Sequence, residues 1–346
     1  MVADDLAGRP LLGALHPASL FERRFQPLGI DVTCQGADQA LMDGAAAVLE
    51  SRAPAEPTGL RLRLLLLRSP AGMAPGRADG LGAFAAAADG RAYREAGSLL
   101  AVLTPSGSCV LADLEGGRAS AFVSGAADLD TEAEALFGAP VWRFAARHGL
   151  VACHAATVVG DSGRGILLRA AGGGGKSTLA LAAWSAGLGL LAEEVTWLDA
   201  RSDGAAVWLR GRPDRIHVAE DVLEILGLAA SAGHQLLSAG SAGGKIRISL
   251  DQAPELLRGS SPAGPVVFLV RGEPAESGAW RPIGPLEAGD RWRATAIPGE
   301  ASQAASALAA VHGRLLARGA YLLGNDAPAR MVERLRAIDA HWEKQG

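Results

Sequence analysis

Residues 170–178 read Ala-Ala-Gly-Gly-Gly-Gly-Lys-Ser-Thr. They follow a short apolar run, residues 165–169, and precede an Ala- and Leu-rich segment, residues 179–187. This order predicts a strand, a glycine-rich turn and a helix, which is the setting of a phosphate-binding P-loop. Glycine lets successive backbone N–H groups point at phosphate oxygens, and the helix adds its positive N-terminal end. The stretch therefore predicts a nucleoside triphosphate site in an α/β fold.

Two side chains of the loop have direct tasks in such a site. Lys176 would reach the β- and γ-phosphates, and the Ser177 hydroxyl would hold Mg²⁺. Ala170 departs from the motif G-x-x-x-x-G-K-[ST], which has glycine at this position. The alternative is a flexible Gly/Ala loop in a glycine-rich chain, but Lys-Ser-Thr and the flanking segments favour the phosphate site. With ATP and Mg²⁺ as the expected cofactors, the binding residues are Gly172, Gly173, Gly174, Gly175, Lys176, Ser177 and Thr178.

Composition limits the other classes of function. The 346 residues have room for two domains, and the 49% of apolar residues allow a large core. A net charge of −4 gives no electrostatic signature for nucleic acid or an anionic membrane. The three cysteines are widely spaced and predict neither a disulfide framework nor a zinc site. No signal peptide and no membrane-spanning run is recognisable, so we expect a cytoplasmic protein.

The first part of the chain, residues 1–140, is predicted to be a separate, mostly β or α+β region. Residues 60–67 are strand-like, and the Pro/Gly-separated apolar runs after them suit an antiparallel meander. No catalytic constellation is apparent here, and His16 is expected to be a surface or capping residue. The three runs of the meander are residues 99–103, 108–114 and 119–123.

The remainder, residues 141–346, is predicted to be the α/β nucleotide-binding domain, entered through a helix over residues 131–147. One strand over residues 150–159 should turn into the strand that precedes the P-loop. The helix after the loop should end at Gly187, a favoured C-terminal residue. The further expected elements are strands over residues 188–192, 195–198, 205–209 and 265–270, and helices over residues 301–318 and 326–343.

Glu193 and Glu194 interrupt the strand region that follows the P-loop helix. Phosphoryl transfer needs a metal on the phosphates and a group that positions and deprotonates the acceptor hydroxyl. Two adjacent carboxylates can divide that work, but side chains alternate along a strand, so the strand must end or kink there. The alternative is a solvated acidic pair. His154, on the strand before the P-loop strand, is by itself best interpreted as a core histidine.

The order of His154-Ala-Ala, the Lys-Ser-Thr loop and Leu191-Ala-Glu-Glu-Val195 resembles the HPr serine kinase/phosphorylase family. The similarity is closer to the HPr-kinase-related enzymes of bacterial clusters for ribosomally made peptides, including lasso-peptide kinases. It covers roughly residues 140–320. The resemblance implies a P-loop sheet of the HPr-kinase/PEP-carboxykinase type, preceded by a smaller, variable N-terminal domain.

The resemblance also implies roles for residues. His154 would assist at the acceptor, and Glu193 and Glu194 would replace the family's Asp-Asp pair, as base and as metal ligand respectively. The segment Gly244-Lys-Ile-Arg-Ile248 resembles a basic strand of these relatives, in which Lys245 and Arg247 would face the transferred phosphate. Two exposed basic residues on an edge strand are the equally weighted alternative.

Two departures from the family bear on the activity. Glu-Glu adds one methylene to each acidic side chain, and a displacement of about 1 Å is costly in catalysis. The acidic, glycine-rich stretch by which family members contact HPr is not recognisable here, which argues against HPr as the substrate.

The sequence thus predicts an ATP- and Mg²⁺-dependent phosphotransferase acting on a hydroxyl, with a Ser or Thr of a peptide or small protein as the leading acceptor. A kinase of a small hydroxylated metabolite and a non-catalytic, nucleotide-dependent adaptor remain as alternatives. Residues 1–140 are expected to recognise the acceptor or to form contacts in a homo-oligomer. Neither nucleic acid nor membrane is an expected partner.

Overall fold

The computed structural model divides the chain into two compact units. Unit 1 comprises Met1–Phe25, Ile30–Glu50 and Leu60–Phe144, and unit 2 comprises Gln26–Gly29, Ser51–Gly59 and Ala145–Gly346. His16 lies outside the described residues. The structure describes residues 20–69, 85–86, 90–125, 127–201, 206–213, 215–219, 221–226, 245–250, 253–270, 280–296 and 305–345.

Unit 1 contains a mixed eight-stranded sheet in the order β1-β2-β3-β8-β7-β6-β5-β4. The predicted meander is confirmed, because β6, β7 and β8 pair antiparallel in succession. The strand predicted over residues 60–67 is also confirmed as β3, which runs parallel to both of its neighbours. The strands are β1 Phe21–Phe25, β2 Asp31–Gly36, β3 Arg61–Arg68, β4 Ala85–Ala86, β5 Ala92–Ala96, β6 Leu99–Leu103, β7 Cys109–Asp113 and β8 Arg118–Val123.

Helices cover one face of this sheet. On β3 the alternate residues Leu62, Leu64 and Leu66 are buried, as expected when one face of a strand lies against a core. Helix α2 (Gln39–Leu49) packs there, and the Asp38 side chain caps it by accepting a hydrogen bond from the Leu41 amide. The helix predicted over residues 131–147 is present as α3 (Leu129–Ala133), the π-helical segment η4 (Glu134–Gly138) and α4 (Ala139–Arg147).

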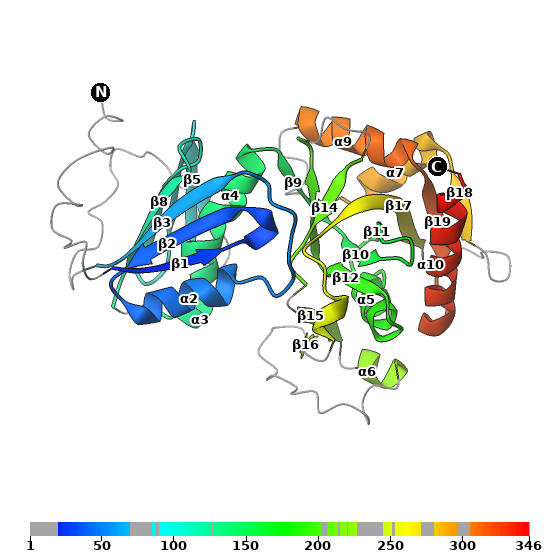
Figure 1. The fold of residues 1–346 in the computed structure, drawn as a ribbon, viewed down its shortest axis with the longest axis horizontal. Coiled ribbons are helices and arrows are strands. Elements are labelled where there is room, and N and C mark those ends of the chain that lie inside the picture. The colour runs from blue at the N-terminus through cyan, green and yellow to red at the C-terminus, as the bar shows by residue number, and fades with distance from the viewer. Residues whose placement is uncertain are drawn as a thin grey trace. The chain divides into compact units, whose positions relative to one another are not determined.

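Unit 2 is built on a mixed nine-stranded sheet (Figure 1). Its main path is β12-β10-β11-β17-β14-β13-β9, and β19 and β18 extend it beside β17. Strands β11, β17 and β19 are parallel, and the other pairs are antiparallel. The strands are β9 Leu150–His154, β10 Ala156–Val159, β11 Gly165–Arg169, β12 Gly189–Ala192, β13 Val195–Asp199, β14 Trp208–Arg210, β17 Ser260–Val270, β18 Trp280–Ile283 and β19 Ala320–Gly324.

Both faces of the unit 2 sheet are covered (Figure 1). One core packs α5 (Lys176–Ser185) and α10 (Pro328–Glu343) against the sheet, together with a separate two-stranded ribbon. The other core contains buried residues of α7 (Pro285–Ala294) and α9 (Ala305–Ala317). The ribbon consists of β15 (Arg215–Ala219) and β16 (Lys245–Ser249), and α6 (Asp221–Ile225) follows β15. The layers make unit 2 an α/β structure, as predicted.

One predicted strand of unit 2 is wrong in its extent. Residues 150–159 form two strands, β9 and β10, which separate at Ala155. The Ala155 amide donates to the Cys153 carbonyl at 2.8 Å, a tight turn that redirects the chain. Strand β9 then pairs with β13, whereas β10 pairs with β11 and β12. The buried Thr196 hydroxyl donates to the Ala155 carbonyl at 3.0 Å and stabilises this corner.

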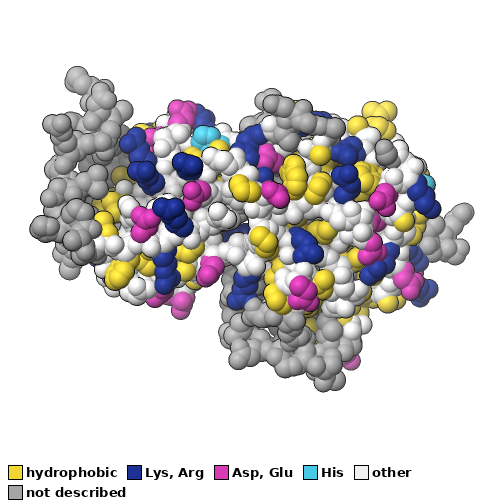
Figure 2. Space-filling model, in the orientation of Figure 1, with side chains coloured by type: hydrophobic (Ala, Val, Ile, Leu, Met, Phe, Trp, Pro, Cys, Tyr) yellow, Lys and Arg dark blue, Asp and Glu magenta, His cyan; other side chains and the backbone are white. Residues whose placement is uncertain are grey.

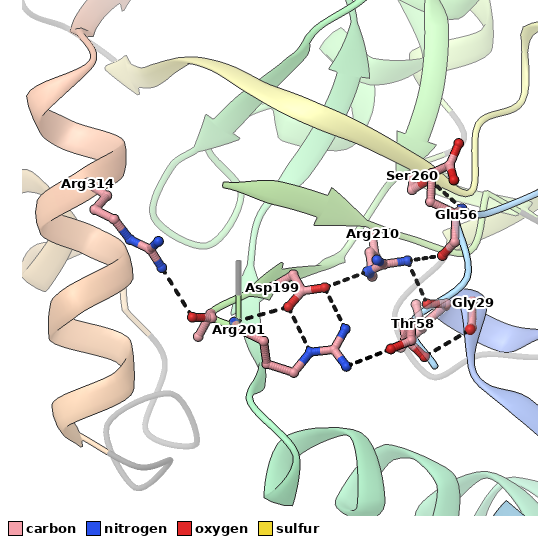
Figure 3. A network of polar contacts seen from close by, with 10 residues as sticks. Gly29, Glu56, Thr58, Asp199, Arg201, Arg210, Ser260 and Arg314 are labelled. Atoms are coloured by element: carbon pink, nitrogen blue, oxygen red, sulfur yellow. Dashed lines mark hydrogen bonds and ion pairs between the residues drawn. The ribbon is translucent and has the colours of Figure 1, made fainter. Parts of the chain in front are cut away.

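The division into units differs from the predicted boundary after residue 140. It falls inside α4, and two segments from the first part of the chain, residues 26–29 and 51–59, belong to unit 2. Arg210 donates to Asp199 at 3.1 Å and to the Leu28 carbonyl at 3.1 Å (Figure 3). Arg201 donates to Asp199 at 2.7 Å and to the Thr58 carbonyl at 3.0 Å. These two connector segments are therefore part of the unit 2 scaffold.

The three cysteines, Cys34, Cys109 and Cys153, are buried, and none of them is in a disulfide bond. None of the helices among the described residues is both long and apolar enough to cross a bilayer. On the face shown in Figure 2, basic and acidic side chains are interspersed among apolar ones.

Asp199 should be a main contributor to the stability of unit 2. Burial opposes its ionisation, but the hydrogen bond from Arg201 and the charges of Arg201 and Arg210 outweigh burial, so the pKa of Asp199 lies below its usual value. Asp199→Asn leaves the buried Arg210 without its counter-charge and should lower the free energy of unfolding by about 3 kcal/mol at pH 7, measured by chemical denaturation.

The pH dependence of the unfolding free energy tests whether the negative charge of Asp199 causes this stabilisation. A carboxyl whose pKa is lowered by folding stabilises the protein above its unfolded-state pKa of about 3.9, and loses that contribution as the pH falls through the folded-state value. The difference between wild type and Asp199→Asn should therefore persist down to about pH 4 and shrink below it. Asp290→Asn, which removes an exposed ion pair, is the control and should have a much smaller effect. A pH-independent difference would contradict this account.

Candidate functional site

The backbone of the glycine-rich loop, residues 170–175, is set by two glycines with positive φ. Strand β11 ends at Arg169, and helix α5 begins at Lys176. Between them Gly173 has φ of 70° and Gly175, the N-cap of α5, has φ of 91°. Both values lie in the left-handed region, which glycine adopts without steric cost. The predicted order of strand, glycine turn and helix is therefore present, with Thr178 in the first turn of α5.

The alanine at position 170 fits the loop because position 174 is glycine. Ala170 is buried, and a Cβ atom added to Gly174 would lie 2.5 Å from the Ala170 Cβ and 2.9 Å from the Ala171 carbonyl oxygen. A Cβ atom on Gly172 would meet nothing within 4 Å. The departure from the motif at residue 170 is thus accommodated inside the loop.

Lys176 is a buried cation. Its side chain Nζ donates to the Ala170 carbonyl at 3.1 Å, and the residue is 8% exposed. Burial and then the nearby positive charge of Arg169 lower the pKa of Lys176, and the carboxylates of Glu193 and Glu194 oppose that shift. The ammonium group therefore lies where an added anion would be strongly favoured.

Arg169, the last residue of β11, is a second buried cation at the base of the loop. It is 0% exposed and lies over the Trp292 ring, with 4.1 Å from the guanidinium carbon to the ring centroid. Its Nη1 donates to the Cys153 sulfur at 2.7 Å, and its Nε donates to the Thr295 hydroxyl at 3.0 Å. These contacts anchor the end of β11 between β9 and α7.

The two glutamates occupy different environments. They lie in the bend between β12, which ends at Ala192, and β13, which begins at Val195. Glu193 is 8% exposed and accepts a hydrogen bond of 2.5 Å from the Ser177 hydroxyl to Oε1, whereas Glu194 is exposed. The sequence hypothesis assigned the metal to Glu194 and the base to Glu193. In the structure it is Glu193 that meets Ser177.

The other predicted residues are placed by strand pairing. His154 ends β9 and lies opposite Val195, the residue that follows Glu194. In the ribbon, Lys245 lies opposite Ala219. Arg247 lies opposite the central residue of β15. The side chains of these two basic residues are outside the described part of the structure.

The sequence reasoning missed one residue, His217. It is the central residue of β15, and its Nδ1 atom is 3.6 Å from Oε2 of Glu193. Alternation of Ile216 and Val218 around it does predict that residue 217 points away from the core. Nothing in the local sequence indicates that the side chain meets the acidic pair, because that contact joins segments distant in sequence.

The donor set around Ser177 fits a magnesium ion. A hydroxyl and a carboxylate are hard oxygen ligands, and Mg²⁺ in nucleotide sites takes few protein ligands beside phosphates and water. No group of three or more His, Cys, Asp or Glu side chains with metal-binding geometry occurs among the described residues. Ser177 and Glu193 would therefore hold the ion together with a nucleotide.

A cavity in unit 2 lies away from this site. It measures about 630 Å³ and lies at the opposite end of β11 from the P-loop, with Gly163, Trp208 and Arg258 among its lining residues. None of the P-loop residues and neither glutamate lines it. The candidate site is thus defined by its charges and hydrogen bonds and not by cavity volume.

Comparisons with known proteins give likenesses to solved structures alone. No protein-family model matches the sequence, and no curated protein matches it. Among solved structures, the Hpr(Ser) kinase/phosphatase from Coxiella burnetii is similar at 14% identity with a TM-score of 0.31, over 56% of this chain and 99% of that chain. A TM-score of this size carries no functional weight, so the interpretation rests on the residues described above.

The packing of the loop predicts different effects for two neighbouring glycines. Gly174→Ala should lower the free energy of unfolding by about 1–3 kcal/mol, because the new methyl group overlaps Ala170. Chemical denaturation measures the change. Gly172→Ala is the matched control and should be nearly neutral, since its methyl group meets open space. The double variant Ala170→Gly/Gly174→Ala should recover part of the loss. Equal stability of the two single variants would contradict the close approach at Ala170.

Proposed function

We propose that this protein is an ATP- and Mg²⁺-dependent kinase that phosphorylates a hydroxyl, with a Ser or Thr of a peptide or small protein as the acceptor. The observation that carries the proposal is the state of Lys176. Among the described residues its only hydrogen bond is to a neutral carbonyl, although it is a buried cation at the start of a helix. Burying a charge is unfavourable, and Glu193 and Glu194 act on Lys176 only through space without pairing with it, so this position supports an anionic ligand.

Several features of the loop favour a phosphate over other anions. Glycines at residues 172–175 leave the backbone open, and Gly172, Gly173 and Gly175 have nothing within 4 Å of where a Cβ atom would be. The N-terminus of α5 adds the partial positive charge of its free N–H groups. Together with Lys176, these groups would bind the β- and γ-phosphates of ATP.

The Ser177–Glu193 pair supports the metal. In the proposed complex both oxygens would hold Mg²⁺, which neutralises phosphate charge as the phosphoryl group is transferred. This exchanges the two roles that the family resemblance implies, because Glu193 rather than Glu194 meets the P-loop serine. The proposal thus makes Glu193 the metal-side carboxylate.

Glu194 is the proposed base. It is exposed at the same bend and adjoins the His154–Val195 pair, so an acceptor can approach it from solvent. The acceptor oxygen would attack the γ-phosphorus, the bond to the ADP oxygen would break, and the hydroxyl proton would pass to Glu194. His154 would assist at the acceptor, and Lys245 and Arg247 would face the transferred phosphate.

Acceptor recognition is assigned to residues 1–140, which contain no phosphate- or metal-binding motif and mostly form unit 1. The other role proposed for residues 1–140 is to form the contacts of a homo-oligomer.

Lys176→Ala tests the nucleotide site. Loss of a charged hydrogen-bond donor should weaken MgATP binding at least about tenfold in calorimetric titration, and phosphoryl transfer should be abolished. Lys344→Ala, at the exposed end of α10, is the matched control and should bind as wild type does. Circular dichroism should show both variants folded. Unchanged MgATP affinity in Lys176→Ala would refute the P-loop assignment.

Substitutions of the two glutamates should affect different measurements, the Mg²⁺ requirement for one and the reaction rate for the other. Glu193→Gln should raise the Mg²⁺ concentration needed for ATP binding, because an amide is a poorer ligand than a carboxylate for a hard cation. Glu194→Gln should retain MgATP binding and lose roughly 10²–10⁴-fold in the rate of ADP formation with acceptor present. The reverse pattern would restore the roles implied by the family resemblance. If both variants behave as wild type does, Glu193 and Glu194 have no role in catalysis and are only a solvated acidic pair at a bend.

A further inference from the structure

The carboxylate of Glu193 is contacted from two sides by different elements of unit 2. Its Oε1 accepts the 2.5 Å hydrogen bond from Ser177 at the start of α5. Its Oε2 is 3.6 Å from Nδ1 of His217 in the middle of β15. Ser177 already has a role in the proposed site, whereas His217 has none. The question is what the histidine contributes.

The backbone of His217 is held firmly on both sides. Its neighbours Ile216 and Val218 are buried in the core that also contains α5. Before β15, Gly211 passes so close to β12 that an added Cβ would lie 2.0 Å from the Leu191 carbonyl oxygen. The chain is therefore fixed against the strand that leads into Glu193, and alternation turns the His217 side chain away from the core.

The His217 side chain extends from this fixed backbone to the carboxylate of Glu193. His217 is 36% exposed, whereas Glu193 is 8% exposed. A carboxylate with one oxygen on a metal ligand and the other unsupported can rotate about its last torsion, which has broad minima. A partner 3.6 Å from Oε2 restricts that freedom. Groups that orient metal ligands in this way typically change metal affinity about 10- to 100-fold when removed.

We infer that His217 is a positioning residue for the metal: its Nδ1 holds Oε2 of Glu193, so that Oε1 stays at Ser177 where Mg²⁺ would bind. This inference rests on the proposed nucleotide and metal site. It assigns His217 no contact with the nucleotide or the acceptor.

The same contact has a consequence for the ribbon. Arg247 is the cross-strand neighbour of His217, and Lys245 is two residues along the same strand. The strand that carries both basic residues therefore pairs with the strand whose central histidine contacts Glu193.

Two substitutions at residue 217 distinguish the contact of the imidazole nitrogen with Glu193 from the packing of the ring. His217→Phe keeps a ring of similar shape and removes both nitrogens. His217→Asn keeps an N–H donor near the place of Nδ1 on a smaller side chain.

The probe is Mn²⁺, titrated into full-length protein saturated with the ATP analogue AMP-PNP. Binding is followed by the electron paramagnetic resonance signal of the free ion. Metal-free AMP-PNP affinity is measured separately in the presence of EDTA.

His217→Phe should weaken Mn²⁺ binding by about tenfold or more, and metal-free AMP-PNP affinity should stay within about twofold of wild type. His217→Asn should restore most of the Mn²⁺ affinity. His341→Phe, in α10 beside Trp280 and Tyr321, is the matched control and should leave both affinities unchanged.

Three results would overturn the inference. Wild-type Mn²⁺ affinity in His217→Phe would show that the contact is not needed. Equal weakening in the Phe and Asn variants would show that the imidazole acts in another way. An equal loss of metal-free nucleotide affinity would place His217 in the nucleotide site or the fold. If wild type itself binds neither AMP-PNP nor Mn²⁺, the proposed function fails, which is a separate result.

Discussion

The burial of the Lys176 ammonium group is the constraint on which the site depends. A cation with a carbonyl as its only hydrogen-bond partner among the described residues is costly in an interior, and Arg169 adds a second positive charge nearby. The nearest opposing charges come from Glu193 and Glu194, on a bend between two strands. A bound phosphate would complete the charge balance. The fold therefore tolerates an excess of buried positive charge, which a phosphate ligand can neutralise.

The different surroundings of the two glutamates follow from how the sheet turns its corner. Strand β12 pairs with β10, and β13 pairs with β9, so the chain must cross from one pair to the other between residues 192 and 195. The two strands that pair with them, β9 and β10, are separated by the matching turn at Ala155. Because neither glutamate lies within a strand, their side chains are not forced to opposite faces by pleating. One becomes buried against α5, and the other remains exposed.

The glycine-rich loop with its strand and helix was predictable because glycine content and apolar periodicity are local properties of a chain. The corner at Ala155 was not, since residues 150–159 contain neither Gly nor Pro and only strand pairing divides them. Strand β19 was missed between two predicted helices, although it is fully buried beside β17. The contact of His217 with Glu193 was also unpredictable, because it depends on where a separate ribbon packs. The motif residues could be named from the sequence, but which glutamate contacts Ser177 depends on tertiary packing.

Strand β13 connects the candidate site to the connector segments. It begins directly after Glu194 and ends at Asp199, whose two arginine partners also bind the carbonyls of Leu28 and Thr58 (Figure 3). Five residues of strand span only about 13 Å between the first and last Cα atoms, and a paired strand resists bending along its length. The acidic bend is therefore fixed at one end by Ser177 and, through β13, by a network that includes chain segments preceding unit 1 strands. Residues 26–29 and 51–59 thus belong to the scaffold of the candidate site in unit 2.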